Sequence, residues 1–169
     1  MINQLKVGKL DAARRQLETA VLLYFNDKDP VSIHTLVCAA HEVIGELNKQ
    51  AGGTPLMLEG GMIKDEYKED FKKQVRKAKN FFKHANSDPD ETIDFNPETN
   101  EFYLLDACEG YEILTKEKNP YFTIYRGWFF YLNPNFLKDQ TNFQIIKNKF
   151  GNNKAEYFSS MLSASGTLR

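Results

Sequence analysis

Hydrophobic residues recur every three to four positions along most of the chain, which is the spacing that places them on one face of an α-helix. The pattern is clearest from about residue 29 to 50, and it stops at Gly52 and Gly53. Similar patterns predict further helices over about 9–25, 64–85, 96–115, 120–132, 134–150 and 153–164. No segment shows a convincing alternation typical of a β-strand.

Prolines mark several of these predicted helix starts. Five of the six follow an Asp or Asn, at Asp29, Asp88, Asn96, Asn119 and Asn133. An Asx side chain caps the free amides at a helix start, and proline fits the first helical position without losing a hydrogen bond. The chain therefore predicts an all-α single domain over 1–169. We expect a helical bundle with a long helix-hairpin core, additional C-terminal helices, and frayed ends at 1–8 and 164–169.

The composition limits the class of protein and its cellular location. With 169 residues, 41% of them hydrophobic and 27% charged, the chain can bury a substantial core. The formal net charge of −1 argues against a general nucleic-acid coat protein, so contact with nucleic acid would need a local patch. Two cysteines, no leader-like N-terminus and no membrane-length apolar run predict a cytoplasmic protein that does not enter a membrane.

One such patch lies near the end of the predicted helix 64–85. It contains six cations, Lys72, Lys73, Arg76, Lys77, Lys79 and Lys83. A helical wheel places Lys72, Arg76, Lys79 and Lys83 in one stripe beside the apolar stripe. The patch ends in Lys79-Asn80-Phe81-Phe82-Lys83-His84.

Two interpretations of this patch remain open. Cations beside an imidazole can hold a phosphodiester and move protons near neutral pH, with Asn80 orienting the substrate or His84. Alternatively, the lysines form a solvated face balanced by the acidic residues between 65 and 70, and His84 only stabilises the helix end.

The run KNFFKH resembles the Arg-Asn-x-x-x-His signature of the HEPN superfamily. The resemblance implies a small all-helical domain, often dimeric, that is a metal-independent ribonuclease or an inactive relative. Lys79 would take the place of the motif Arg, Asn80 that of the next polar residue, and His84 that of the catalytic His. Lysine lacks the planar fork of arginine, and this departure favours binding over cleavage.

The whole chain is also similar to a group of uncharacterised bacterial proteins that share stretches such as LDAARRQLETA, DPVSIHTL and NFFKHA. We therefore expect a HEPN-like protein that binds or cleaves RNA through Lys79, Asn80 and His84, without a metal or cofactor. The phosphate-binding residues would be Lys72, Arg76, Lys77 and Lys83. On an ideal helix Lys79 points away from His84, so joint action requires a bend or a second subunit.

Two other groups of residues allow different functions. His34, Cys38 and His41 share one side of the predicted helix 29–50, either as zinc or copper ligands or as a packing face that Gly45 opens to a neighbour. The helix 120–132 is apolar nearly all round and rich in aromatic residues, which is typical of a core or dimer contact. The alternative function is thus a non-catalytic interaction or regulatory module that forms a homodimer through this helix.

Overall fold

The structure is a computed structural model that describes residues 4–60, 64–85, 89–137 and 143–166. These residues form seven α-helices and two short 3₁₀-helices, with no strand among them, which confirms the predicted all-α class. In chain order the elements are α1 (Lys9–Phe25), α2 (Pro30–Gln50), η1 (Met57–Glu59), α3 (Asp65–Lys83), α4 (Thr99–Thr115), α5 (Pro120–Leu132), η2 (Pro134–Phe136), α6 (Phe143–Phe150) and α7 (Lys154–Ala164).

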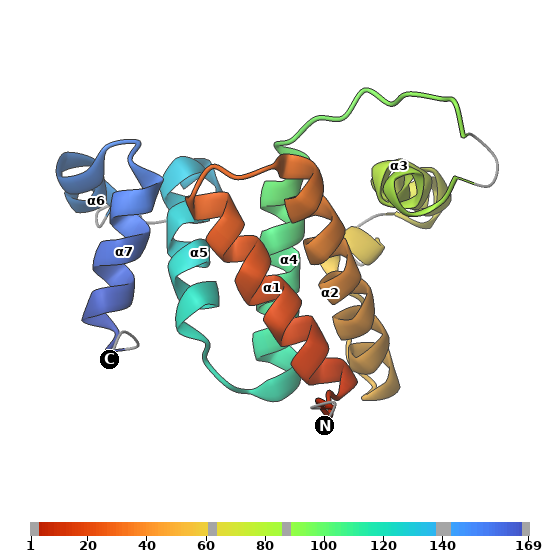
Figure 1. Ribbon diagram of the computed structural model, residues 1–169, viewed down its shortest axis with the longest axis horizontal. Coiled ribbons are helices and arrows are strands. Elements are labelled where there is room, and N and C mark those ends of the chain that lie inside the picture. Colours follow the sequence, from red (N-terminus) through yellow and green to blue (C-terminus); the bar gives the residue numbers. More distant parts are fainter. Residues whose placement is uncertain (1–3, 61–63, 86–88, 138–142, 167–169) are drawn as a thin grey trace.

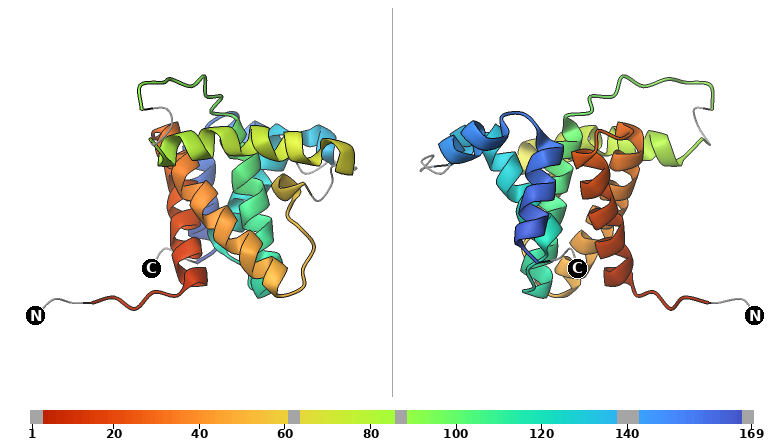
Figure 2. Two further views of the ribbon diagram at one scale, coloured as in Figure 1. Left: turned by 90° about the vertical axis from the view of Figure 1, so that its right-hand side faces the viewer. Right: turned by 60° about the vertical axis from the view of Figure 1, so that its left-hand side comes forward.

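The helices form a bundle built on the hairpin of α1 and α2 (Figure 1). α4 packs against α2, α5 packs against α4, and α7 covers the side of α5 that faces away from α2 (Figure 1). α3 does not run along the bundle. It crosses one end of it, over α2 and α4 (Figure 2). No helix within the described ranges combines the length and the apolar character that a membrane span requires.

Side-chain caps explain where several helices begin. The Asp29 carboxylate accepts the backbone N–H of Ser32 at the start of α2, and the Asn119 side chain accepts that of Tyr121 at the start of α5. The Asx-Pro prediction holds at both sites. At Asn96 the side chain instead accepts the N–H of Glu98 within a turn, so that α4 begins three residues later, at Thr99.

The structure corrects the predicted helix 134–150. It consists of η2 and α6, which are separate because Leu137 adopts an extended backbone that ends η2. The predicted helix 64–85 is α3, which ends at Lys83. Residues 4–8 lie outside any helix and α7 ends at Ala164, while 1–3 and 167–169 lie outside the described residues.

Aromatic rings fill the core where α1, α5 and α7 meet. Phe25 stacks on Phe158 with ring centroids 4.5 Å apart, and it contacts Tyr125 and Trp128 edge-on at 6.1 and 6.3 Å. Trp128 is only 2% exposed within the single chain. The aromatic helix 120–132 is therefore a core element, and Trp128 is already buried without a second subunit.

α3 differs from the other long helices because none of its side chains is buried. The Tyr103 hydroxyl of α4 donates to the Val75 carbonyl at 2.7 Å, and Lys79 and Lys83 reach Glu42 of α2. This light attachment leaves a pocket on either side of the contact between Val75 and Tyr103.

Candidate functional site

One of these pockets has charged walls, and we refer to it as the charged pocket. It has a volume of about 510 Å³ and lies between α2, η1 and α3. Its lining residues are His41, Glu42, Glu46, Leu58, Glu59, Val75, Arg76, Lys79, Asn80, Lys83, His84 and Tyr103. A single chain therefore brings together most of the candidate residues of the α3 patch.

The predicted site residues divide into two groups. The pocket-lining group contains Arg76, Lys79, Asn80, Lys83 and His84. Lys72 and Lys77 do not line this pocket. Lys72 pairs with Glu69 of its own helix at 3.2 Å, and Lys77 lines the second pocket.

The end of α3 explains how Lys79 and His84 share a pocket. His84 is the C-cap of the helix, and its backbone is extended rather than helical. Its N–H still donates to the Asn80 carbonyl at 3.0 Å, which keeps it beside the last turn. His84 therefore departs from the ideal helical position that points away from Lys79, and no second subunit is needed to bring the two residues to one pocket.

Two of the cations form ion pairs with Glu42 of α2. The Glu42 carboxylate lies 3.2 Å from the Lys79 ammonium and 3.5 Å from that of Lys83. Burial on its own raises the pKa of Glu42, but the two ammonium groups outweigh it and hold that pKa below its ordinary value. Arg76 makes no ion pair with any residue that the structure describes.

The other walls carry acidic groups with partners of their own. The Glu59 carboxylate accepts the backbone N–H of Leu56, which closes the first turn of η1. Gly45 makes room for this side chain, because a Cβ there would overlap the Glu59 carboxylate. The expectation that Gly45 permits a close approach is confirmed, although the neighbour is a 3₁₀-helix side chain rather than another α-helix.

A buried carboxylate–imidazole pair lies beside the same pocket. His41 Nε2 is 2.7 Å from Asp106 Oδ2, and His41 is 7% exposed. Asp106 also accepts the backbone N–H groups of Met57 at 3.0 Å and Leu58 at 2.8 Å, so it joins α4 to both α2 and η1. Sequence reasoning missed Asp106. The available signal was a charged residue inside an apolar stretch of α4, which requires a partner when buried.

His34 and Cys38 form a separate buried pair. His34 Nδ1 lies 2.8 Å from Asn100 Oδ1, and because the Asn100 amide donates to the Pro30 carbonyl, its oxygen accepts from His34. His34 Nε2 is then free to accept from the Cys38 thiol at 3.4 Å. Burial lowers the pKa of His34 and raises the pKa of Cys38 to about 12.

These contacts favour the packing interpretation of the stripe on α2. His41 bonds to Asp106, whereas His34 bonds to Asn100, so the two imidazoles are directed to different partners on α4. Among the described residues, no group of three or more His, Cys, Asp or Glu side chains could hold a metal ion.

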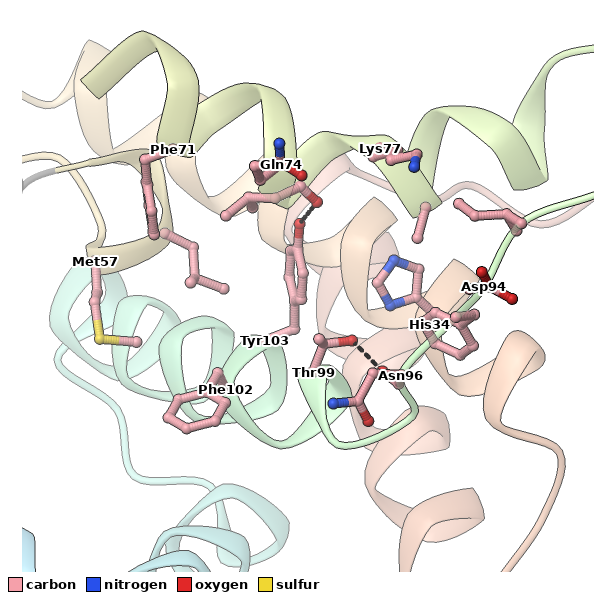
Figure 3. A pocket seen from close by; sticks show the side chains of 15 residues that line it. His34, Met57, Phe71, Gln74, Lys77, Asp94, Asn96, Thr99, Phe102 and Tyr103 are labelled. Carbon is pink, nitrogen blue, oxygen red and sulfur yellow. Dashed lines mark hydrogen bonds between the residues drawn. The ribbon is translucent and has the colours of Figure 1, made fainter. Parts of the chain in front are cut away.

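The second pocket, which we refer to as the apolar pocket, lies between α3, α4 and the segment before α4 (Figure 3). It is the larger of the two, at about 750 Å³. Phe71 of α3, Met57 of η1 and Phe102 of α4 lie at one end of it, and His34 and Asp94 lie at the other (Figure 3). Its walls are mainly apolar, so the charged pocket remains the better candidate for chemistry at phosphates.

Comparisons of the chain with protein-family models, with curated proteins and with solved structures find no match.

Proposed function

We propose that this protein binds RNA in the charged pocket, with phosphates held by Arg76, Lys79 and Lys83. The observation that supports the proposal is that these cations, together with Asn80 and His84, line one pocket of a single chain. These cations share the pocket with Glu42, Glu46 and Glu59, and they attract the phosphate backbone where a phosphate replaces a carboxylate as their partner.

Arg76 has the chemistry that Lys79 lacks. A guanidinium presents a planar fork that fits two phosphate oxygens, whereas an ammonium acts as a point charge. Arg76 is exposed and lacks an ion pair among the described residues. In the resemblance to the HEPN signature, Lys79 replaces the motif Arg, and Arg76 can supply the missing fork from one turn earlier on α3.

Lys79 and Lys83 bind phosphate by exchanging partners. Their present partner, Glu42, is 60% exposed, and ion pairs that open to water contribute little to stability. A phosphate group can therefore replace the carboxylate at small cost. Asn80 and His84 lie at the same wall, where an amide can orient a bound nucleotide and an imidazole can transfer a proton.

The test is RNA binding measured by fluorescence anisotropy with a labelled single-stranded oligonucleotide at several salt concentrations. Arg76→Ala is expected to weaken binding by about tenfold, since hydrogen bonds to charged groups contribute about 1.5 kcal/mol or more. Lys73→Ala serves as the matched control, because Lys73 is an exposed cation of the same helix that does not line the pocket. Absence of binding, or equal losses in both variants, would overturn the proposal.

Cleavage is tested separately with the same oligonucleotide in EDTA. If the pocket is a metal-independent ribonuclease site, products form in EDTA and disappear in His84→Ala.

We also infer a cytoplasmic setting, which fits two free and buried cysteines. The homodimer implied by the resemblance is tested by light scattering.

A further inference from the structure

His41 is placed to act on a ligand in the charged pocket, although the HEPN-like signature does not include it. It lines the pocket from α2, while Lys79 and His84 line it from α3 and its C-cap. Its imidazole is fixed by Asp106, at 2.7 Å. The pocket therefore contains two histidines, one held firmly at the α2 wall and one exposed at the end of α3.

The contacts of Asp106 define the tautomer of His41. Asp106 Oδ2 accepts from Leu58 N–H and lies against His41 Nε2, and Oδ1 accepts from Met57 N–H. An ionised carboxylate only accepts hydrogen bonds, so Nε2 carries the proton and donates. In neutral His41 the lone pair is then on Nδ1.

Nδ1 of His41 belongs to a ring that lines the pocket. It has no hydrogen-bond partner among the described residues. Among the residues that the structure describes, Trp128 Nε1 is the only fully buried side-chain nitrogen or oxygen without a hydrogen-bond partner. Because His41 Nδ1 also has no partner and is not such an atom, it is not fully buried. A ring nitrogen with a free lone pair, in a pocket that three cations and three glutamates also line, is suited to accept a proton from a bound ligand.

We propose that His41 is the general base and His84 the general acid of a metal-free RNA transesterification. The proposal rests on the proposed function, because it requires RNA in the charged pocket. His41 Nδ1 takes the proton of a ribose 2′-hydroxyl, and the 2′-oxygen bonds to the adjacent phosphorus. The bond between phosphorus and the 5′-oxygen breaks, and protonated His84 gives its proton to that oxygen. The products are a 2′,3′-cyclic phosphate and a free 5′-hydroxyl, so the step needs no oxidant, metal or further reactant.

If His41 had only a structural role, it would need a hydrogen-bond donor but no proton acceptor. Asp106 satisfies the two backbone N–H groups of η1 without help, so a structural residue at position 41 needs only to donate one hydrogen bond. Gln can place a donor near the position of Nε2, but it has no nitrogen that accepts a proton. His41→Gln therefore preserves the structural contact and removes the proposed chemistry.

The experiment compares wild type, His41→Gln and His34→Asn in EDTA, measuring RNA affinity, cleavage rate, product ends and melting temperature. His34→Asn is the matched control, since His34 is also buried on α2 but lines the apolar pocket. We expect His41→Gln to bind RNA as tightly as wild type and to cleave at least about 100-fold more slowly, because general acid–base catalysis contributes about 10²- to 10⁴-fold. The control is expected to retain cleavage.

The outcomes separate this inference from the proposed function. A wild type that binds RNA but does not cleave it overturns the inference and leaves RNA binding intact, whereas a wild type that does not bind refutes both. Normal cleavage by His41→Gln also overturns the inference. If His41→Gln does not fold, His41→Ala is assayed with added imidazole. Restored cleavage at an unchanged melting temperature supports a proton-transfer role, and absence of restoration counts against it.

Discussion

Glu42 offers the sharpest test of whether phosphates occupy the charged pocket. Its carboxylate lies 3.2 Å from the Lys79 ammonium and 3.5 Å from that of Lys83, so it occupies the position at which the proposal places a phosphate. Replacing Glu42 with Gln removes one negative charge and leaves a side chain of nearly the same shape. Both ammonium groups are then available to a ligand.

The exposure of Glu42 determines the expected changes in stability and RNA affinity. Glu42 is 60% exposed, and open ion pairs contribute about 0.2–1 kcal/mol, so the substitution is expected to cost less than about 1 kcal/mol of stability. The same energy no longer opposes the phosphate, which corresponds to a gain in RNA affinity of about 1.4- to fivefold. The pocket also gains one net positive charge, so the slope of log K against log salt becomes more negative by about 0.7 for single-stranded RNA.

Anisotropy titrations at four or more salt concentrations measure both quantities for wild type, Glu42→Gln and Glu66→Gln. Glu66 is an appropriate control because it is an exposed carboxylate in the first turn of α3, outside the pocket. The reasoning is refuted if Glu42→Gln binds RNA no more tightly than the control. A loss of affinity with an unchanged melting temperature would be equally damaging, since it would make Glu42 part of the binding surface.

Three further predictions concern the framework of the site. Asp106→Ala removes the acceptor of three hydrogen bonds and is expected to lower the free energy of unfolding in urea by about 3 kcal/mol. Burial lowers the pKa of His34 below its ordinary 6.5, so the unfolded chain binds more protons and stability falls as pH drops below 6.5; His34→Asn should flatten this loss between pH 7 and 5 in thermal melts. Tyr103→Phe removes the hydrogen bond to the Val75 carbonyl, at a cost of about 1 kcal/mol, and should speed amide hydrogen exchange in α3 more than in α1.

Local sequence signals predicted much of the fold because they act over a few residues. The Asx caps at Asp29 and Asn119 lie where α2 and α5 begin, and the hydrophobic period located α1 at 9–25. The prediction failed over 134–150, where hydrophobic residues continue at helical spacing. Leu137 adopts an extended backbone there, and no local signal in the sequence required it.

The sequence predicted only part of the candidate site. The cationic stripe follows from residue spacing on one helix, so Arg76, Lys79 and Lys83 could be grouped before the structure was known. His41 and Asp106 are 65 positions apart, and their pairing depends on the register of α2 against α4, which periodicity does not determine. The pocket lies where α3 crosses the bundle, and α3 is joined there to Tyr103 of α4 and Glu42 of α2, residues that its own hydrophobic pattern does not identify.

The order of charges along α3 links its stability to the proposed function. Its first two turns are mainly acidic and its last turns are basic, which is the order that the helix dipole favours. A helix that buries none of its side chains depends on such terms more than a core helix does. The same order gathers cations at the end that lines the charged pocket, where they can attract a polyanion. If the order of charges served only the stability of α3, Arg76→Lys would leave RNA binding nearly unchanged. If the Arg76 guanidinium binds phosphate with two hydrogen bonds, Arg76→Lys should weaken RNA binding at an unchanged melting temperature.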